Sequence, residues 1–379
     1  SNAYRGIGAS RAAKYGAVIT TRTRCEELVM NGKKVVGAKI TDLETGETLS
    51  VKARTTIMAA GVWTDPLYKK FGIKPGYAVR MSKGAHIVVP GDAIKSETGV
   101  IIKTDISVLF IIPWGDKWIV GTTDTDYDES REETLASRDD VTYIINQANR
   151  VLEPKLRREQ VIGVFAGLRP LVSTDPDSPT TKLSREHVVD SPTPGFVSIA
   201  GGKYTTYRVM SEDAVNEAIN HLRKIVPDSV TETLAIIGAE GYSVLMNQIP
   251  RLAKLYGISE ESVEHLLNRY GSLIDEVLAP ASKNRELLEK LIPELPYLKA
   301  EILYAVTDEG ALSIDDVLSR RTRISFEAKD QGLSAMEEVA DLISEILGWD
   351  SKDKKASMSQ YRELVERQKE VLLQAKELK

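Results

Sequence analysis

The spacing of apolar residues changes near Ile236, and this change constrains the fold more than any other feature of the chain. Before that point apolar side chains tend to alternate with polar ones, which is the period of a β-strand. After it they recur at intervals of three and four, which is the period of an amphipathic α-helix. The sequence therefore predicts a mixed α/β body followed by a separate all-α region.

Turn signals divide the first part of the chain into strands. Residues 11–70 predict a helix, a strand, a hairpin and a further strand, with Asn31-Gly32 and Thr45-Gly46 at tight turns between alternating runs. The next region, residues 71–185, adds the strand-like runs AHIVVP, LFIIPW and KWIVGTTD, and Gly115-Asp116 forms the turn between the last two. These patterns predict antiparallel pairing through short turns.

Four segments after Ile236 have helical spacing. They are residues 259–271, 282–292, 334–347 and 359–378. Ser259 and Ser313 each stand three positions before a polar residue, and the pair Ser313 and Asp316 is typical of a capping box. The lysines near residue 352 precede an amphipathic segment with interspersed glutamates, which favours a salt-bridged exposed helix over a membrane-surface or partner contact.

Composition excludes several classes of protein. The chain has 379 residues, enough for two or three domains, and its net charge of −5 gives no general affinity for nucleic acid. Cys25 is the only cysteine, so no internal disulfide can form and a reducing compartment is expected. No run approaches the roughly 20 apolar residues of a membrane span. Ser1-Asn2-Ala3 reads as an expression scar and is excluded.

Two glycine-containing turns follow short apolar strands. Residues 196–200 run into Gly201-Gly202 and Lys203, and a helix is expected to open at Thr205 and Thr206 with Val209, Ala214, Ala218 and Leu222 on its apolar face. Such a helix start offers free amide groups to an anion, although an ordinary strand-to-helix turn has the same pattern. Residues 55–66 pose the same choice, because a hydrophobic strand ends at Ala60-Gly61 before Trp63.

His86 and Arg169 are the strongest candidates for chemistry. Strand alternation places His86 on the face of Val88, where a structural role or a proton-transfer role is open to it. Arg169 directly precedes Pro170, which restricts its backbone, and we interpret it as a loop arginine. A guanidinium held in this way suits a carboxylate or phosphate.

Other polar groups have weaker claims. His187 is expected in a charged strand, and His221 and His265 on polar helix faces. The acidic cluster Asp124, Asp126, Asp128 and Glu129 lacks the glycine and the distal glutamate of a calcium loop, so a solvated turn is expected rather than a metal site.

Four stretches in this order resemble the FAD-dependent glycerol-3-phosphate dehydrogenase family. They are SKGAHIVVP at 82–90, IIPWGDKWIVGTTDTD at 111–126, GLRPL at 167–171 and AGGKYTTYR at 200–208. The resemblance implies oxidation of glycerol 3-phosphate to dihydroxyacetone phosphate, with electrons passed to a membrane quinone. It also implies a cytoplasmic protein in peripheral contact with the inner face of the membrane, and a homodimer.

The resemblance also implies the residues of the site. His86, Arg169 and Lys203 would be catalytic, with His86 as the first choice for the base and Arg169 as the rival, and Thr205 would join these three in binding the substrate. The implied FAD contacts are Cys25, Ala60, Gly61, Trp63, Gly202, Lys203, Tyr204, Thr205 and Thr206.

The implied fold is a two-dinucleotide-binding flavoprotein with an antiparallel substrate-domain sheet and a C-terminal all-α domain. Its expected parts are a partial FAD-binding domain at 4–70, a substrate-binding sheet at 71–185, a return segment at 186–235 and a helical domain at 236–379. The N-terminal glycine fingerprint of the family has no match, which implies a missing dinucleotide-binding segment and weak or no retention of FAD by this chain alone.

Two alternative functions stay open. One is a flavin oxidase that acts on an amino or hydroxy acid, whose carboxylate would take the place of the phosphate on Arg169. The helical extension of the chain argues against it. The other is a non-catalytic fragment whose helical region binds a partner.

Overall fold

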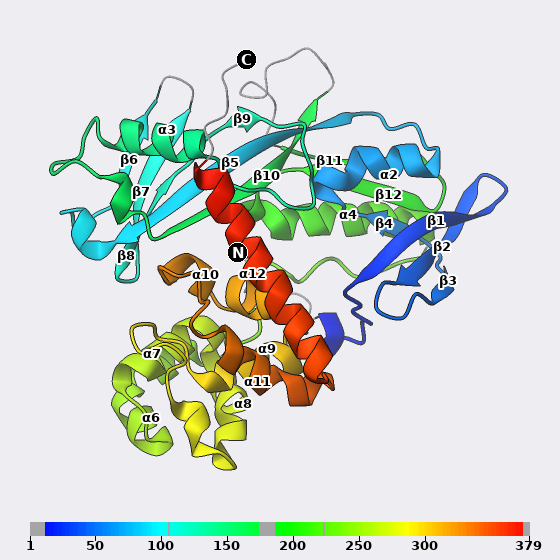
Figure 1. Cartoon of the computed structure of the whole chain (residues 1–379). Coiled ribbons are helices and arrows are strands. Elements are labelled where there is room, and N and C mark those ends of the chain that lie inside the picture. The colour runs from blue at the N-terminus through cyan, green and yellow to red at the C-terminus, as the bar shows by residue number, and fades with distance from the viewer. Residues whose placement is uncertain (1–11, 105–106, 174–185, 223, 374–379) are drawn as a thin grey trace.

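The computed structural model describes residues 12–104, 107–173, 186–222 and 224–373. Its upper part is built of strands with a few helices, and its lower part is helical from α5 (Tyr242–Met246) onward, as Figure 1 shows. The spacing of apolar residues predicted strands before Ile236 and helices after it, and this change is confirmed, as is the mixed α/β class.

The largest sheet has six strands, all antiparallel, in the order β10-β5-β8-β7-β6, with β9 also paired to β5. Their bounds are β5 (Ala78–Pro90), β6 (Val100–Lys103), β7 (Val108–Trp114), β8 (Lys117–Gly121), β9 (Thr125–Asp126) and β10 (Gly163–Ser173). Gly115 has a positive φ at the predicted turn between β7 and β8. This sheet therefore confirms the three strand runs expected in residues 71–185.

One face of this sheet is covered by α3 (Arg138–Ala148), which begins with a capping box between Ser137 and Asp140. Ile87 and Val89 of β5 point to that side and join Ile144 of α3 in one apolar core. Because side chains alternate along a strand, His86 and Val88 point to the opposite face. Because α3 covers one face of the sheet, His86 of β5 lies on the face that α3 leaves uncovered.

Two three-stranded sheets lie beside it. One is the predicted meander of β1 (Thr23–Asn31), β2 (Lys34–Asp42) and β3 (Thr48–Lys52), with Gly32 and Gly46 in left-handed turns. In the other, β4 (Thr56–Met58) pairs in parallel with β12 (Phe196–Gly201), and β11 (His187–Thr193) pairs antiparallel with β12. Between β4 and β5 the chain forms η1 (Gly61–Trp63) and α2 (Thr64–Phe71).

The helix after β12 begins later than its sequence indicates. Residues Tyr204–Thr206 form a 3-10 turn, η5, and α4 runs over Tyr207–Leu222 against β11 and β12. Of the four residues expected on its apolar face, Ala214 and Ala218 are buried, whereas Val209 is exposed. The expected face was wrong at Val209, because α4 meets the sheet through Ala214 and Ala218 and through polar residues that bond β11, among them Asp213 and Glu217.

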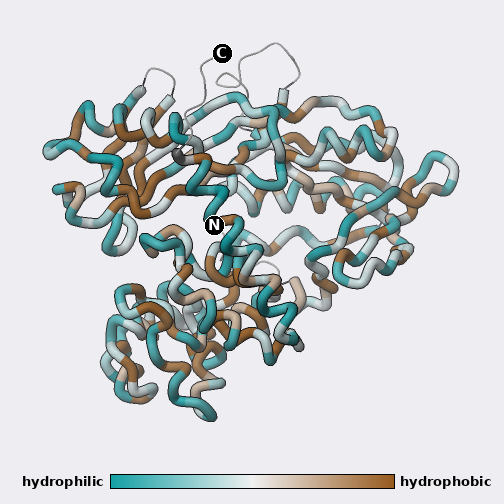
Figure 2. The backbone as a smooth tube through the Cα atoms, viewed as in Figure 1, coloured by the Kyte–Doolittle hydropathy of each residue, from teal (hydrophilic) through white to brown (hydrophobic). Residues whose placement is uncertain are grey.

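The helical region contains α5 and seven further α-helices within the described residues. These are α6 (Ile249–Tyr256), α7 (Glu260–Tyr270), α8 (Ile274–Leu278), α9 (Lys299–Thr307), α10 (Ile324–Glu327), α11 (Met336–Leu347) and α12 (Ser351–Leu373). Two apolar cores hold them together, and Figure 2 shows hydrophobic stretches in both the strand body and the helical region. Three of the four predicted helices are confirmed as α7, α11 and α12. Helix α12 begins earlier than predicted, at Ser351, and the predicted residues 374–378 lie outside the described residues.

The prediction of a helix at 282–292 was wrong. The segment contains only short 3-10 turns, among them η8 (Arg285–Leu288). Pro293 and Pro296 follow it, and the N–H of Leu291 donates to the carbonyl of Tyr297 at 2.9 Å, so the chain reverses instead of continuing as a helix.

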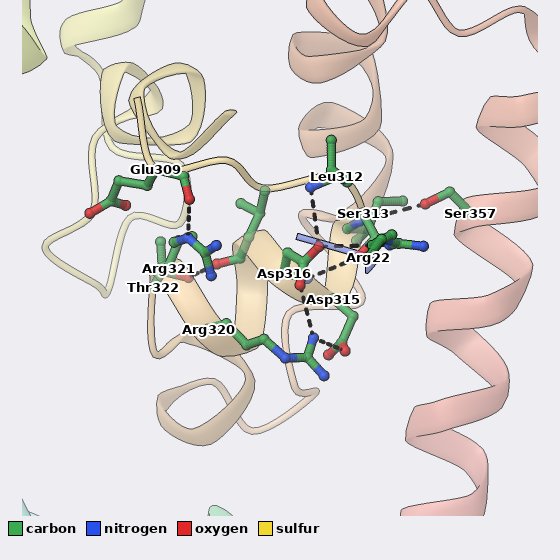
Figure 3. A network of polar contacts seen from close by, with 12 residues as sticks. Arg22, Glu309, Leu312, Ser313, Asp315, Asp316, Arg320, Arg321, Thr322 and Ser357 are labelled. Carbon is green, nitrogen blue, oxygen red and sulfur yellow. Dashed lines mark hydrogen bonds and ion pairs between the residues drawn. The ribbon is translucent and has the colours of Figure 1, made fainter. Parts of the chain in front are cut away.

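Several contacts join the helical region to the strand body. Arg22 lies 3.1 Å from Glu44, and it also lies 3.9 Å from Asp316, in the polar network of Figure 3. In that network the hydroxyl of Ser313 accepts from the N–H of Asp316, while the Asp316 carboxylate accepts from Leu312 rather than from Ser313. Only half of the predicted capping box therefore forms. A further contact lies near the C-terminal end of α12, where the side chain of Gln368 donates a hydrogen bond to the carbonyl of Val164 in β10 at 3.0 Å.

We propose domain bounds of 4–70, 71–185, 186–235 and 236–379, of which the bound at 236 is supported by the separate apolar cores on either side of it. Residues 224–236 are exposed throughout. We expect limited trypsin digestion to cut first after Lys224, because an exposed connecting segment fits a protease best. Mass spectrometry of the fragments checks this. Lys117, which is buried in β8, is a control site that should survive, and first cleavage inside the helical region would contradict the boundary.

Candidate active site

The candidate site lies on the face of the six-stranded sheet opposite α3. At its centre β5 is flanked by β10 and β8, so that His86 stands opposite Phe165 on one side and Gly121 on the other. A side chain at Gly121 would collide with the His86 ring. The His86 and Phe165 rings are stacked, with centroids 4.9 Å apart and planes 11° apart. The ring of His86 is therefore held between a glycine and an aromatic neighbour.

Arg169 lies across the same face. It is not on a loop, as its sequence context suggested, but in the middle of β10 opposite Ser82, and Pro170 is tolerated there because β10 is an edge strand. Its Nη2 donates to the Oγ1 of Thr122 at 2.7 Å and its Nη1 to the carbonyl of Thr123 at 3.2 Å. Any side chain at Gly84 would occupy the space of the guanidinium, so that glycine allows Arg169 to lie over β5.

Asp124 belongs to the site, which corrects the interpretation of the acidic cluster as a solvated turn. Its side chain is only 4% exposed and its Oδ1 lies 3.6 Å from the Nη1 of Arg169. The hydroxyl of Ser82 also donates to Asp124. Asp126, by contrast, is exposed and lies 3.4 Å from Arg80. The sequence signal for Asp124 was its place directly after β8, in the TTDTD run.

His86 combines an unpartnered atom with a displaced pKa. Its Nδ1 is buried and has no hydrogen-bond partner within the described residues. Burial, and then the positive charge of Arg169, lower the pKa of His86 to about 4. The imidazole ring is therefore neutral at pH 7. A neutral imidazole can accept a proton from a bound molecule.

We expect stability to fall as pH drops from 6.5 toward 4, because the unfolded chain binds a proton at His86 in that window and the folded chain does not. A pKa of about 4 in the folded state against 6.5 in the unfolded state gives a loss of roughly 2 kcal/mol by pH 5. Urea unfolding at pH 7 and at pH 5 measures this loss in the free energy of unfolding. His86→Asn should flatten this part of the pH dependence.

His187→Asn is the matched control, since His187 bonds Asp213 at 2.8 Å outside this face, and it should leave the loss in place. Equal pH dependence in the parent and in His86→Asn would show that the buried ring is not its source.

The segments expected at the flavin lie beside this face. The η1 turn (Gly61–Trp63), preceded by Ala60, contacts β5, β10 and β12. Gly61 has a φ of +56° and open space where a side chain would be, and Trp63 is exposed. A ligand can approach the backbone closely at such a position.

The turn after β12 is also open. Gly202 has a φ of +79° and is crowded by Met210, so no other residue fits there without strain. The next four residues are exposed: Lys203, Tyr204, Thr205 and Thr206. Gly201 packs against Val172, three residues after Arg169, which brings this turn next to β10. The structure thus places the Lys203 turn and the Arg169 strand in contact.

Cys25 and the other histidines lie elsewhere. Cys25 is in β1, where its carbonyl accepts from Lys70 at the end of α2 away from Trp63. His221 and His265 are not on polar helix faces, as predicted, but face inward: His221 contacts Ser191 and the N–H of Gly195, and His265 contacts Glu301. Carboxylate and backbone partners explain how these polar rings are accommodated.

No group of three or more side chains suited to a metal ion occurs in the described residues. Nor does any helix among them combine the length and apolar character needed to cross a bilayer.

Comparison with known proteins decides the family. Residues 8–208 match the family model described as FAD dependent oxidoreductase, and residues 229–354 match that of the C-terminal domain of alpha-glycerophosphate oxidase. The chain belongs to the FAD dependent oxidoreductase family. The resemblance drawn from the four motifs, the flavoprotein fold and FAD as the cofactor of the family are thereby confirmed.

Two similar proteins carry the name glycerol-3-phosphate dehydrogenase. The chain is 43% identical over 367 residues to a protein named glycerol-3-phosphate dehydrogenase from Mycobacterium leprae, covering 97% of this chain and 62% of the relative. It is 32% identical to the human mitochondrial glycerol-3-phosphate dehydrogenase, covering 93% of this chain and 50% of that protein. The chain thus spans about half to two thirds of the length of these relatives.

A solved structure supports the same fold. The glycerol-3-phosphate dehydrogenase from Bacillus halodurans, determined in complex with FAD, is similar with a TM-score of 0.83 and 28% sequence identity. The similarity covers 95% of this chain and 71% of the other. The antiparallel sheet and the C-terminal helices therefore belong to the shared fold.

Proposed function

We propose that this protein catalyses the FAD-dependent oxidation of sn-glycerol 3-phosphate to dihydroxyacetone phosphate and passes the electrons to a quinone. One observation carries the proposal: the guanidinium of Arg169 and the neutral imidazole of His86 share one face of the sheet, beside the open turn at Lys203. An anion site next to a proton acceptor is what oxidation of a phosphorylated alcohol requires.

The residues present fit FAD on this side of the sheet. Gly61 and Gly202 have positive φ angles, the first with open space above it, and the backbone at Lys203 precedes a helical turn. We propose that Ala60, Gly61, Trp63, Gly202, Lys203, Tyr204, Thr205 and Thr206 contact the cofactor here, and that Cys25 contacts its far end. When bound, FAD supplies the oxidant, which takes a hydride from the substrate carbon.

Arg169 binds and orients the substrate anion in this proposal, and Lys203 and Thr205 add a charge and a hydroxyl. The Arg169 guanidinium is already fixed by Thr122, Thr123 and Asp124, so little conformational freedom is lost when the anion binds. Asp124 is a positioning residue because it contacts the guanidinium.

His86 accepts the hydroxyl proton at Nε2, since Nδ1 is buried, as the carbonyl of the product forms. The charge of Arg169 is one cause of the low pKa of this histidine, and an anion bound to Arg169 offsets that charge. Substrate binding therefore raises the pKa of His86 toward the range useful for a base. Arg169 is the rival candidate for this step.

The electron acceptor and the location form a finer part of the proposal. Relatives named dehydrogenase support an acceptor other than oxygen, for which we propose a quinone. A quinone would place the protein on the inner face of the cytoplasmic membrane by peripheral contact, and we propose a homodimer there.

The two alternatives are less well supported. An oxidase for amino or hydroxy acids would use Arg169 for a carboxylate, but the match of residues 229–354 to the C-terminal domain of alpha-glycerophosphate oxidase favours a glycerol phosphate. A non-catalytic fragment would not require an unpartnered histidine beside a fixed arginine, so the presence of both residues on one face argues against that alternative.

The test is the visible spectrum. We expect the chain alone to hold FAD weakly, because a glycine turn and helix start for the pyrophosphate are missing from its sequence, and a version extended at the N-terminus to the length of the relatives to be yellow. Anaerobic glycerol 3-phosphate should bleach the extended protein. Stoichiometric FAD on this chain alone would contradict the first expectation, and a yellow protein bleached only by an amino or hydroxy acid would favour the oxidase.

A further inference from the structure

A second cavity lies away from the His86–Arg169 face, between the turn joining β7 to β8 and the helical region. Its volume is about 630 Å³, and its walls come from both parts of the chain. The residues that matter for its chemistry are Trp114, Tyr242, Arg269, Tyr297, Arg323 and Glu327.

Arg269 is a buried cation in this cavity with unused donors. Its side chain is 9% exposed and lies over the rings of Tyr270 and Tyr297, at 5.3 and 5.7 Å from their centroids. Only its Nε has close polar partners, the hydroxyl of Tyr270 at 2.9 Å and Glu301 at 3.6 Å. The two terminal nitrogens donate to no acceptor among the described residues.

Arg323 supplies a second guanidinium to the lining of the same cavity. It precedes α10 and lies 4.9 Å from the ring of Trp114, at the end of β7. No described residue accepts a hydrogen bond from it. Two arginines with free donors therefore line one cavity, one from α7 and one from the segment before α10.

The neighbouring carboxylates Glu301 and Glu309 act electrostatically on Arg269, but neither accepts a hydrogen bond from its terminal nitrogens among the described residues. Glu301 is fully buried and already accepts from Tyr270, His265 and the N–H of Leu298. Asp116 pairs with Lys117 at 2.6 Å. Burial raises the pKa of Glu327, and the charges of Lys117 and Arg323 together with a hydrogen bond from Tyr297 oppose that shift, so the charge of Arg323 also acts on this carboxyl.

We propose that this cavity binds a small organic phosphate, with its oxygens shared by Arg269 and Arg323 and a flat or apolar part against Trp114 and Tyr297. Two guanidinium forks from different elements match a group with three terminal oxygens better than a carboxylate with two. The cavity size suits a compound no larger than a typical small-molecule ligand. No residue of the proposed flavin site takes part, so this site is independent of the proposed function.

Such a ligand would bridge two parts of the chain. Trp114 belongs to the hairpin whose second strand, β8, pairs with β5 at His86. Arg269 and Arg323 belong to the helical region. Binding would therefore hold the hairpin against the helices and raise the temperature of unfolding.

The experiment is a titration of the present chain with inorganic phosphate at fixed ionic strength, followed by calorimetry and by tryptophan fluorescence. We expect saturable binding that changes the fluorescence, and loss of that change in Trp114→Phe. Arg323→Gln should weaken binding at least about tenfold, because charge-assisted hydrogen bonds are lost. Arg285→Gln, an exposed arginine of η8, removes the same net charge and should leave the affinity unchanged.

A second set of variants separates this site from the proposed active site. Phosphate bound at Arg169 should disappear in Arg169→Gln and leave the cavity component intact. Arg269→Gln should abolish the cavity component, and where it fails to fold, Arg323→Gln decides. The proposal is overturned by the absence of saturable binding, by unchanged affinity in Arg323→Gln, or by loss of all binding in Arg169→Gln, and none of these results affects the flavin proposal.

Discussion

Arg169→Lys is expected to lower kcat/KM for glycerol 3-phosphate by roughly ten- to a hundredfold in the flavin-loaded protein, with little change in flavin content. Lysine keeps the positive charge but cannot contact Thr122, Thr123 and a substrate anion at once, as the guanidinium of Arg169 can. The loss of one charge-assisted hydrogen bond, worth about 1.5–3 kcal/mol, sets the size of the effect. Steady-state kinetics and the visible spectrum measure both quantities.

The control is Arg158→Lys, since Arg158 bonds the carbonyl of Arg138 and the hydroxyl of Thr142 away from the site. It should leave kcat/KM unchanged. If His86 is the base, the acid limb of the pH–rate profile should vanish in His86→Asn and persist in Arg169→Lys. Loss of flavin in step with activity in Arg169→Lys would instead assign the arginine to cofactor binding.

Glu301→Gln is expected to destabilise the chain by about 3–5 kcal/mol, the cost of breaking a buried ion pair by removing one partner. Glu301 is fully buried, and its oxygens lie 3.0 Å from His265 Nε2 and 3.6 Å from Arg269 Nε. Burial alone would raise the pKa of Glu301, but the contacts with His265 and Arg269 hold it below the ordinary value. The amide nitrogen of glutamine would also place its N–H donors opposite groups that donate hydrogen bonds to Glu301.

Urea unfolding at pH 7 measures this change in free energy. Glu289→Gln is the matched control, because Glu289 is a largely exposed carboxylate that pairs with Lys299 at 2.9 Å, and it should cost less than about 1 kcal/mol. A loss of similar size in both variants would mean that the buried network is no stronger than a surface ion pair. Since the pKa of Glu301 is lowered in the folded chain, its stabilising effect should also fade as pH drops below the ordinary carboxyl range.

Local features of the fold could be predicted from sequence, and long-range ones could not. Asn31-Gly32 and Gly115-Asp116 identified two hairpin turns because tight turns demand particular residues. The pairing of β5 with β10 joins residues 75 to 95 positions apart, and no spacing in the sequence indicates it. For that reason Arg169 was interpreted as a loop residue.

The same limit applied to the site. His86 and Arg169 could be singled out by residue type and motif, but Asp124 was assigned to solvent because its neighbours Asp126 and Asp128 suggested an acidic turn. His265 was predicted to lie on a polar helix face, but it contacts the buried Glu301. In each case the missing information was a partner from a distant part of the chain, which decides whether a charged group can be buried.

The helical region supports the stacked rings of His86 and Phe165, because Phe326 of α10 lies 5.4 Å from the Phe165 ring at an angle of 57°. Three rings from β5, β10 and α10 thus contact one another in turn, and the last comes from a segment some 240 positions further along the chain than the histidine. Rotation of the imidazole requires its neighbours to yield, so the entropy of orienting that ring is spent during folding and not when a substrate arrives. The last third of the polypeptide therefore helps to fix the orientation of the His86 ring on the sheet face.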